Sequence, residues 1–465
     1  MFVKSGNRLK DWTPDIEIEA PAVFVRSQKK FPQSRIDTSM LDRKLIVNQP
    51  DLVKRNCERR SVGCDIARLL ELESQRSDLL QLVQDLNRQA NEVSQSLANA
   101  KAPAERQERM TKGRELRARK DAAQKAHDEL DIEINFMMRL IPNLTHPDAP
   151  DGDENDSVEI GRGIHPIRSF TFAAKDHLEI GKLHDLFDFE AGARVAGHGF
   201  YFLKNSAVRL DLALQHFAVN FLSRRGFTPI TTPDLAFTEI LHGTGFMPRG
   251  PETQIYSIEN SELNLVATAE ITLGGMMAGQ TLDAESLPIR LCGLSHCFRT
   301  EAGAAGRASK GLYRVHQFTK VEMFAFTSPE QSERIHQEMK NIECEIFDAL
   351  EVPYRVIDTA AGDLGGPAYR KYDLEAWMPG RGEQGEWGEV TSTSNCTDYQ
   401  ARRLNIRSKT QGQKGTWFVH TLNGTAIATG RAIIAILENH QNADGSITIP
   451  KALRELMGED RLMPS

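Results

Sequence analysis

A long hydrophobic repeat runs through the N-terminal quarter of the chain. Between Leu69 and Ala100, ten positions recur alternately three and four residues apart, and nine of them are apolar. Such a repeat is the pattern of a coiled-coil seam. Arg76 is the polar exception, and we expect it to lie at the base of the seam or to reach solvent along its aliphatic stem.

A second helix is predicted directly after this repeat. Pro103 fixes a short turn and suits the first position of a helix. About 36 residues of helix, at 1.5 Å per residue, give a length of roughly 54 Å. Two such helices would form an antiparallel arm that ends at Pro142. The apolar face of the second helix consists of Leu116, Ala123, Leu130, Ile134 and Met137.

The outer part of this arm is basic. Residues 101–125 contain nine Lys or Arg and four acids, a local charge of +5 in a chain of net charge -7. A cationic arm suits a phosphate backbone. Taken alone, the charge run is more simply explained as a solvated helix face, and a dimerisation coiled coil would fit the same repeat.

Composition divides the chain into four parts. Residues 1–39 hold three prolines and seven cations against five acids, so we interpret them as a disordered extension or a misassigned start, with a transit peptide the less favoured alternative. Residues 40–147 form the arm domain. Residues 148–165 form a linker with an acidic run that does not favour a packed core. Residues 166–465 form the large C-terminal domain.

The C-terminal domain alternates predicted helices and strands without βαβ regularity, which favours an antiparallel sheet flanked by helices, an α+β fold. The sequence contains no GxxxxGK[ST] motif, and its GxGxxG match at residues 380–385 (GRGEQG) is followed by a β-rich run and not by a helix, so Rossmann or P-loop nucleotide binding is not supported. The predicted helices are 208–225, 329–350 and 426–439, and the predicted strands are 227–232, 263–266, 289–298, 313–318, 323–326 and 416–422.

Composition also restricts the class of protein. The 465 residues contain no run of about 18 apolar residues, so we expect no membrane partner. Six scattered cysteines without a C-x-x-C pair indicate neither zinc nor a disulfide framework. A cytoplasmic location is the simplest interpretation.

Residues 298–322 (FRTEAGAAGRASKGLYRVHQFTKVE) form the most informative segment. Two strand-like runs flank a glycine-rich loop and present Arg299, Arg314 and the aromatic ring of Phe318. Arginine forks match phosphate oxygens, and an aromatic ring offers a face for a base. A triphosphate with a flat base is therefore a candidate ligand, and a solvated basic hairpin is the alternative.

Two further segments carry candidate chemistry. Thr268 and Glu270 follow an apolar strand, where a hydroxyl and a carboxylate could hold an amine; helix capping by Thr268 is the alternative, and both are compatible. Glu389 and Ser392 lie on one β-rich run, where only a bulge would aim both at one metal ion. Oxygen ligands there, with Asn395 nearby, imply Mg²⁺.

Three segments resemble, in order and form, the three motifs of class II aminoacyl-tRNA synthetases: residues 226–233 (GFTPITTP), 298–322, and 422–438 (LNGTAIATGRAIIAILE). Residues 268–270 (TAE), 391–395 (TSTSN) and the helical arm make the resemblance specific to seryl-tRNA synthetases of the common bacterial type. It covers about residues 40–458. It implies a class II catalytic domain with an antiparallel sheet, plus an N-terminal antiparallel coiled-coil arm.

The resemblance implies a serine–tRNA ligase. Such an enzyme activates L-serine with ATP and Mg²⁺, without zinc, to seryl-adenylate, and transfers the seryl group to the 3′ end of tRNA(Ser), or of tRNA(Sec) where that tRNA exists. It also implies a homodimer, whose arms grip the long variable arm of the tRNA. The alternatives are a catalytically inactive synthetase-like binding protein, an amino acid:carrier protein ligase and a plain coiled-coil scaffold.

The resemblance also implies residue roles. The catalytic residues would be Arg299, Arg431 and Glu389, and the metal ligands Glu389 and Ser392. ATP would contact Arg299, Thr300, Glu301, Arg314, Val315, Phe318, Glu389, Val390, Thr391, Ser392 and Arg431. Serine would contact Thr268, Ala269, Glu270, Arg299, Glu322, Asn423 and Thr425. The arm would contact tRNA through Arg109, Lys112, Arg114, Arg117, Arg119 and Lys120.

The sequence departs mildly from this family at three positions. Thr391, Thr393 and Thr425 stand where many relatives have Ser, Cys and Ser, and the two Ser-to-Thr changes keep a hydroxyl. Retention of Arg299 and Glu322, with Glu389 and Arg431, weighs against an inactive protein. The long arm weighs against a carrier-protein ligase, and the catalytic motifs weigh against a plain scaffold.

Overall fold

The long hydrophobic repeat folds as the first of two paired helices. The structure is a computed structural model that describes residues 41–97, 100, 102–246, 254–301 and 311–464. All of these belong to one unit, residues 37–465. The predictions made for residues 1–39 and for the loop 302–310 therefore lie outside the described residues.

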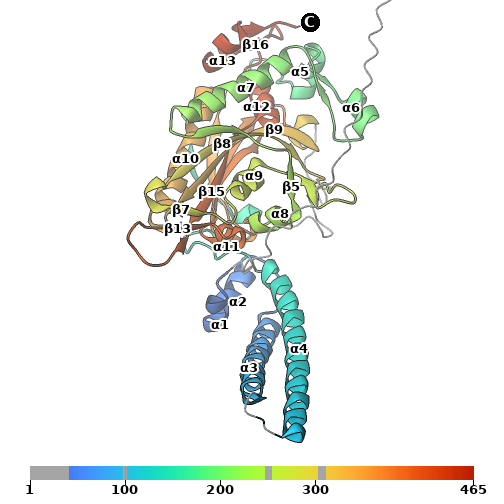
Figure 1. The fold of residues 1–465 in the computed structure, drawn as a ribbon. Coiled ribbons are helices and arrows are strands. Elements are labelled where there is room, and N and C mark those ends of the chain that lie inside the picture. Colours follow the sequence, from blue (N-terminus) through green and yellow to red (C-terminus); the bar gives the residue numbers. More distant parts are fainter. Residues whose placement is uncertain (1–40, 98–99, 101, 247–253, 302–310, 465) are drawn as a thin grey trace, which may run out of the picture. The chain divides into compact units, whose positions relative to one another are not determined.

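The arm consists of α3 (Ile66–Leu97) and α4 (Pro103–Leu140), which lie side by side in Figure 1. Pro103 opens α4 as expected. Leu86 and Ala90 of α3 pack against Leu116 and Ala123 of α4, so the two helices are antiparallel. Arg76 stays in the seam region as a half-buried residue and donates to Glu73 at 3.0 Å.

Two short helices cover the base of the arm. They are α1 (Arg43–Asn48) and α2 (Pro50–Arg59). Ile46 and Val53 from these helices pack with Leu69 and Leu72 of α3 and Ile134 of α4. The base of the arm thus has a hydrophobic core of its own, separate from the seam further out.

Eight described strands form the main sheet of the catalytic part, in the order β1-β10-β11-β12-β15-β9-β8-β4. All neighbours pair antiparallel except β4 and β8, which are parallel. The α+β class with an antiparallel-dominated sheet is therefore confirmed. The strands are β1 (Val158–Arg162), β4 (Thr228–Thr231), β8 (Ile289–Phe298), β9 (Gln317–Thr327), β10 (Tyr354–Asp358), β11 (Arg370–Met378), β12 (Glu386–Asn395) and β15 (His420–Ala428).

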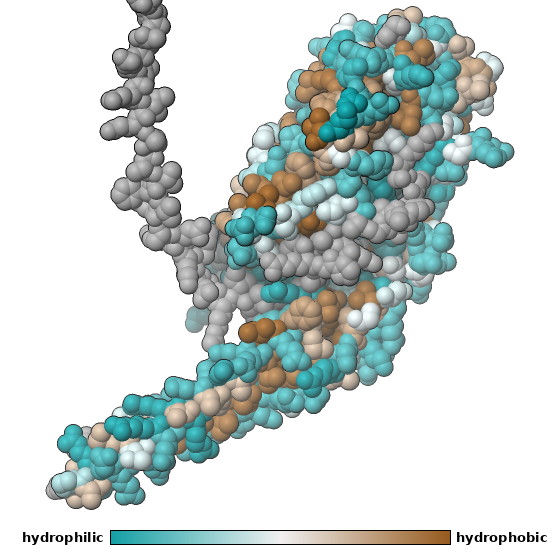
Figure 2. Space-filling model, turned by 90° about the vertical axis from the view of Figure 1, so that its right-hand side faces the viewer, coloured by the Kyte–Doolittle hydropathy of each residue, from teal (hydrophilic) through white to brown (hydrophobic). Residues whose placement is uncertain are grey.

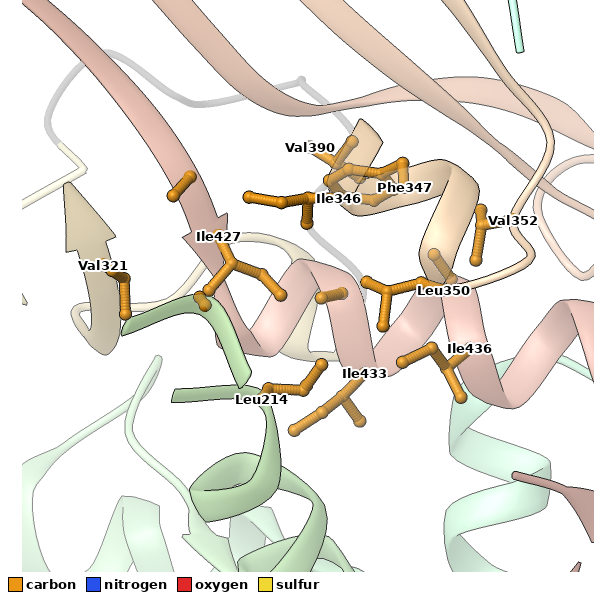
Figure 3. Close-up of a cluster of buried hydrophobic side chains, with 14 of the residues drawn as sticks. Leu214, Val321, Ile346, Phe347, Leu350, Val352, Val390, Ile427, Ile433 and Ile436 are labelled. Atoms are coloured by element: carbon orange, nitrogen blue, oxygen red, sulfur yellow. The ribbon is translucent and has the colours of Figure 1, made fainter. Parts of the chain in front are cut away.

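One face of this sheet is covered by three helices: α7 (Ser206–Ser223), α10 (Pro329–Ala349) and α12 (Thr429–Asn439). Figure 3 shows how their side chains meet those of the strands. Leu214 of α7, Phe347 of α10 and Ile433 of α12 converge with Val321 of β9 and Ile427 of β15. This core holds the back of the sheet rigidly, which leaves the other face free to carry polar side chains.

The opposite face carries a second, smaller core. Phe324 and Phe326 of β9 pack there with Leu273 of α9 (Ala269–Met276) and Leu404 of α11 (Tyr399–Leu404). The remaining described helices are α5 (His177–Leu183), α6 (Phe189–Ala196), α8 (Thr238–Thr244) and α13 (Lys451–Met457), and the remaining strands are β2 (Phe187–Asp188), β3 (Phe202–Leu203), β5 (Leu235–Phe237), β6 (Leu263–Leu265), β7 (Thr281–Asp283), β13 (Arg407–Lys409), β14 (Trp417–Phe418), β16 (Ile447–Thr448) and β17 (Arg461–Leu462).

Several predicted boundaries are wrong. Residues 313–316, predicted as the start of a strand, lie before β9, and residues 317–318 and 323–326 belong to this one continuous strand, in which Lys320 and Glu322 pair with each other on one face. The predicted strand 416–422 is divided between β14 and β15. The helix expected from residue 426 begins at Thr429, because 420–428 form one buried strand. Residues 158–162, assigned to the linker, instead form the edge strand β1, paired with β10.

Apolar side chains gather in patches on an otherwise polar surface in the view of Figure 2. Among the described residues, no helix combines the length and the apolar character that crossing a membrane would require.

Candidate functional site

Two cavities with four lining residues in common lie on the polar face of the sheet. The first has a volume of about 120 Å³ and the second about 410 Å³. The ladder between β12 and β15 covers only 393–395 and 422–424. Residues beyond it, including Ser392 and Thr425, line the cavities, so the site lies where the two central strands stop pairing. The shared residues are Arg299, Lys320, Ser392 and Thr425.

Strand β9 supplies one wall through alternate residues. Phe318, Lys320 and Glu322 share a face because side chains along a strand alternate. The residues between them, such as Val321, enter the core behind the sheet. Further along the same face, Phe324 is fully buried. The site therefore occupies the polar half of a strand face whose other half is core.

The first cavity contains the predicted arginines and the aromatic ring. The guanidinium carbon of Arg299 lies 5.3 Å from the centre of the Phe318 ring. Arg314 donates to Glu301 at 2.7 Å. Glu301 adopts a left-handed backbone with φ 52°, a conformation that costs energy for a non-glycine residue and occurs often at functional sites. Val315 completes this wall.

The opposite wall is formed by β12 and the start of α12. Opposite β11, β12 contains one extra residue between Glu389 and Thr391. This extra residue forms a β-bulge, which lets Glu389 and Ser392 point to the same face of β12. Both residues line the first cavity. Arg431, in the first turn of α12, reaches Glu389 Oε1 at 3.1 Å. Burial alone would raise the pKa of Glu389, but Arg431 and other nearby cations outweigh it and lower the pKa.

Glu322 stands in the second cavity as one member of a buried ion pair. Its Oε2 lies 2.6 Å from Lys320 Nζ and accepts from Thr425 Oγ1 at 3.3 Å. Glu322 is 2% and Lys320 6% exposed. A buried charge pair needs such close geometry to offset the loss of hydration. Both contacts use Oε2, so Oε1 is the oxygen that remains for a ligand.

Glu270 is a second buried carboxyl group in this cavity. Its Oε1 accepts from Gln400 Nε2 at 2.6 Å and from Asn423 Nδ2 at 3.0 Å. Burial, and secondly the negative charge of Glu322, raise the pKa of Glu270 to about 7. Thr268 caps α9 by accepting from Glu270 N at 3.2 Å and also lines the cavity. Capping and ligand contact are thus compatible for this residue.

Some predicted residues are not brought to the cavities by their side chains. Ala269 is fully buried in the smaller core. Thr300 is held outside both cavities by a backbone bond to Gln254 O, 3.0 Å long. Val390 lines the first cavity, but it also packs into the main core behind the sheet. Thr391 lines the first cavity, but its hydroxyl donates to Glu343 of α10 at 3.0 Å, behind the sheet.

Two lysines of the second cavity, Lys320 and Lys371, were missed by the sequence analysis. Lys320 follows from the two-residue period between Phe318 and Glu322, so its signal was present. Lys371 lies 3.2 Å from Asp363 Oδ2 and 3.1 Å from Asp373 Oδ2. These contacts come from a loop and from β11, and no local pattern indicated them.

The predicted tRNA-binding cations of the arm differ in solvent exposure and in the contacts they already make. Arg109 is turned toward α3 and donates to Ser96 O and Glu105. Lys120 is half-buried and lies 3.5 Å from Asp121. The exposed members of the predicted set are Lys112, Arg114, Arg117 and Arg119. Across the ranges that the structure describes, no cluster of three or more His, Cys, Asp or Glu side chains is arranged to hold a metal ion.

The chain is similar to known proteins over almost its entire length. Residues 40–145 match the seryl-tRNA synthetase N-terminal domain family, and residues 254–440 match the tRNA synthetase class II core domain (G, H, P, S and T) family. A serine–tRNA ligase of Rhodopirellula baltica is 68% identical over 91% of this chain and 99% of its own length.

Two solved structures are similar as well. A seryl-tRNA synthetase of Pyrococcus horikoshii complexed with ATP has a TM-score of 0.84 at 38% identity and covers 91% of this chain and 100% of its own. A cytoplasmic serine–tRNA ligase of Naegleria fowleri in complex with AMP has a TM-score of 0.79 at 28% identity, covering 92% and 99%. With these identities over almost its entire length, the chain belongs to the seryl-tRNA synthetases and is a class II serine–tRNA ligase.

Proposed function

We propose that the first cavity binds ATP, that the second binds serine, and that Arg299 contacts both substrates. The observation that carries this assignment is the set of four residues common to both cavities. They bring a nucleotide α-phosphate and an amino-acid carboxylate within reach of one guanidinium. The similarity to a relative solved with ATP and another with AMP supports a nucleotide in this site.

In the first cavity, Phe318 offers its ring to adenine. Arg314 and Arg431 offer guanidinium groups to the phosphates, and Glu301 holds Arg314 in place. Arg431 is kept in a fixed position by Glu389 and by the Tyr313 ring, 4.8 Å away. Arginines fixed before ATP binds act as preorganised donors for phosphate charge.

Mg²⁺ would be held with ATP by Glu389 and Ser392. Both present oxygen atoms, the ligands that Mg²⁺ prefers, and both lie on one face beside the bulge of β12. One or two protein ligands suffice because Mg²⁺ usually keeps waters and phosphate oxygens in its shell. Bound there, the ion would neutralise charge on the phosphates during substitution.

In the second cavity, Glu270 and Thr268 suit the serine ammonium group. Glu322 and Thr425 suit the hydroxyl, with Asn423 beside them. Alanine would offer no hydroxyl to Glu322 Oε1, the oxygen that neither Lys320 nor Thr425 contacts. A site built for a hydroxyl can discriminate against a ligand that lacks one by about 10⁴-fold or more.

The reaction then has two steps. The serine carboxylate attacks the α-phosphorus of ATP, forming seryl-adenylate and releasing pyrophosphate. The terminal ribose hydroxyl of tRNA(Ser), or of tRNA(Sec) where it exists, attacks the serine carbonyl and releases AMP. No enzyme nucleophile is needed, so the protein contributes positioning and charge stabilisation.

The arm would bind the tRNA backbone through its exposed cations. Lys112, Arg114, Arg117 and Arg119 are available for phosphate contacts, whereas Arg109 already joins the two helices. We assign residues 40–147 to this tRNA-binding domain, 148–165 to a linker whose end contributes β1, and 166–465 to the catalytic domain.

A homodimer is supported by apolar side chains that are exposed on several elements between residues 195 and 237. Val208 and Leu212 lie one turn apart on α7, and Leu212 is 58% exposed. Phe202 of β3, Val195 of α6 and Phe237 of β5 are also exposed. Exposed apolar side chains on neighbouring elements are typical of a protein interface.

Exchange of labelled pyrophosphate into ATP, measured with each amino acid in turn, tests the proposed substrate sites. We expect serine alone to support exchange, followed by charging of tRNA(Ser). Exchange with threonine but not with serine would refute the assignment of the second cavity.

A further inference from the structure

The second cavity has a wall that belongs to neither proposed substrate. Asp363, Gly365, Gly366, Pro367 and Ala368 line the second cavity, and none of them lines the first. The wall therefore lies on the side of the serine site that faces away from the nucleotide. It is made largely of backbone, since its residues are mostly glycine, alanine and proline.

The backbone of this wall is held by the arm domain. Six consecutive carbonyl groups, of residues 364–369, accept hydrogen bonds from Arg60, Asn143 or His146. Arg60 donates to Leu364 O at 3.0 Å, to Gly365 O at 2.6 Å and to Ala368 O at 2.9 Å. The backbone and side chain of Asn143 donate to Gly366 O and Pro367 O, both at 2.9 Å, and His146 N donates to Tyr369 O at 2.9 Å.

Arg60 is buried and holds this loop through carbonyl groups, without an acidic partner among the described residues. It is 3% exposed, and none of the ion pairs between described residues includes it. Its charge is balanced by carbonyl dipoles, including Asn143 O at 3.0 Å. Burial lowers the pKa of Arg60 to about 10, which leaves it protonated at neutral pH. The planar guanidinium group presents several N–H donors in a fixed arrangement and can therefore bind several carbonyl groups at once. The single ammonium group of a lysine has no such arrangement of donors.

Asn143 extends the same contacts to the residues that follow strand β12. Its Nδ2 also donates to Cys396 O at 2.9 Å and to Thr397 Oγ1 at 3.0 Å, and Cys396 lines the second cavity. Asn143 is 2% exposed. Asn143 therefore holds two parts of the cavity lining, the wall 364–368 and Cys396, and Arg60 holds the first of them.

The transfer of the seryl group to tRNA suggests a role for this wall. This reasoning rests on the proposed substrate sites. Once seryl-adenylate forms, its nucleotide occupies the first cavity and its serine the polar end of the second. The terminal adenosine of tRNA must then reach the serine carbonyl through the remaining space, which residues 363–368 border.

We propose that Arg60 and Asn143 are positioning residues for the transfer step, fixing the wall 364–368 against which the terminal adenosine of tRNA is placed. The domain that binds the body of the tRNA thereby also shapes the place where its acceptor end reacts. Neither residue touches the reacting atoms. Their effect passes through the backbone of the wall.

The test uses the full-length Arg60→Met enzyme in two assays. Pyrophosphate exchange measures the first step, and single-turnover transfer from preformed enzyme-bound seryl-adenylate to a tRNA(Ser) transcript measures the second. We expect transfer to slow by about 10- to 100-fold, the effect of a displacement of about 1 Å in a reacting partner, while the KM for ATP stays within about twofold. Arg60→Lys, which keeps the charge but not the fork, should give an intermediate loss and covers the case in which Arg60→Met does not fold.

Arg59→Met is the matched control. Arg59 is the neighbouring arginine of α2 and also donates to carbonyls, including His146 O at 3.1 Å, but to none in the wall. It should leave transfer unchanged, and Tm values of all variants report any general loss of stability. Equal losses in exchange and transfer, or unimpaired transfer in Arg60→Met and Arg60→Lys, would overturn the proposal. Failure of the wild-type enzyme to exchange with serine would instead refute the proposed substrate sites.

Discussion

Replacing Glu322 with glutamine should separate serine binding from ATP binding in this enzyme. Glu322 lines the second cavity and not the first. Its carboxylate is paired with Lys320 Nζ at 2.6 Å, and both residues are buried. The change therefore removes a charged acceptor from serine and, at the same time, leaves the ammonium of Lys320 buried without this partner.

The two consequences have different magnitudes. A hydrogen bond to a charged group contributes about 1.5–3 kcal/mol, so the KM for serine should rise by about 10- to 150-fold, since 1.4 kcal/mol is a factor of ten. Breaking a buried ion pair by removing one partner costs about 3–5 kcal/mol of stability. The double variant Lys320→Met/Glu322→Gln should recover much of that stability but not the affinity for serine.

Pyrophosphate exchange at varied serine and varied ATP measures both KM values, and urea unfolding measures the free energy. Two results would refute this reasoning. If the KM for ATP rises as much as that for serine, Glu322 acts on the whole site. If the double variant is no more stable than Glu322→Gln, Lys320 and Glu322 are not coupled.

Three further changes probe the remaining parts of the site and the arm. Burial raises the pKa of Glu270 to about 7. Ionising Glu270 therefore costs folding stability as pH rises from the pKa of the unfolded chain through 7, whereas the ammonium group of serine favours the ionised form. The KM for serine should consequently fall about tenfold from pH 6 to 8, and the Glu270→Gln variant should lose this dependence. Glu389→Gln should raise the Mg²⁺ concentration for half-maximal exchange about tenfold or more, while Glu386→Gln, an exposed change on the same strand, should not. Neutralising Arg117, Arg119 and Lys120 should reduce the magnitude of the slope of the logarithm of the tRNA binding constant against log salt by about 2 to 3. Pyrophosphate exchange should stay unchanged. An equal loss of pyrophosphate exchange would mean that the arm does more than bind tRNA.

The local repeat from Leu69 predicted α3 of the arm. Glu322 was assigned to the site through the resemblance, since the sequence analysis ended one strand at residue 318 and began the next at residue 323. On the continuous strand β9, the two-residue period places Phe318, Lys320 and Glu322 on one face. The start of α12 was misplaced because residues 422–428 are small and apolar, which suits a buried strand as well as a helix.

The sequence could not predict contacts between distant segments. Arg60 and Leu364 are separated by 304 residues, and nothing near either residue indicates the other. Arg109 was predicted to bind tRNA on charge alone, but its position opposite α3 directs it to Ser96 O. The bulge in β12 was required by the chemistry assigned to Glu389 and Ser392, yet its place opposite Leu374 depends on the register with β11.

The charges around the second cavity suit the proposed binding of serine as a zwitterion. Burial, and secondly the negative charge of Glu322, raise the pKa of Glu270 to about 7, while Lys320 and Arg299 lower it. The ammonium group of a bound serine would add a positive charge beside Glu270 and favour its ionised form. On this assignment, serine binding would depend on the charges of the whole cavity, and not only on the groups that touch the hydroxyl.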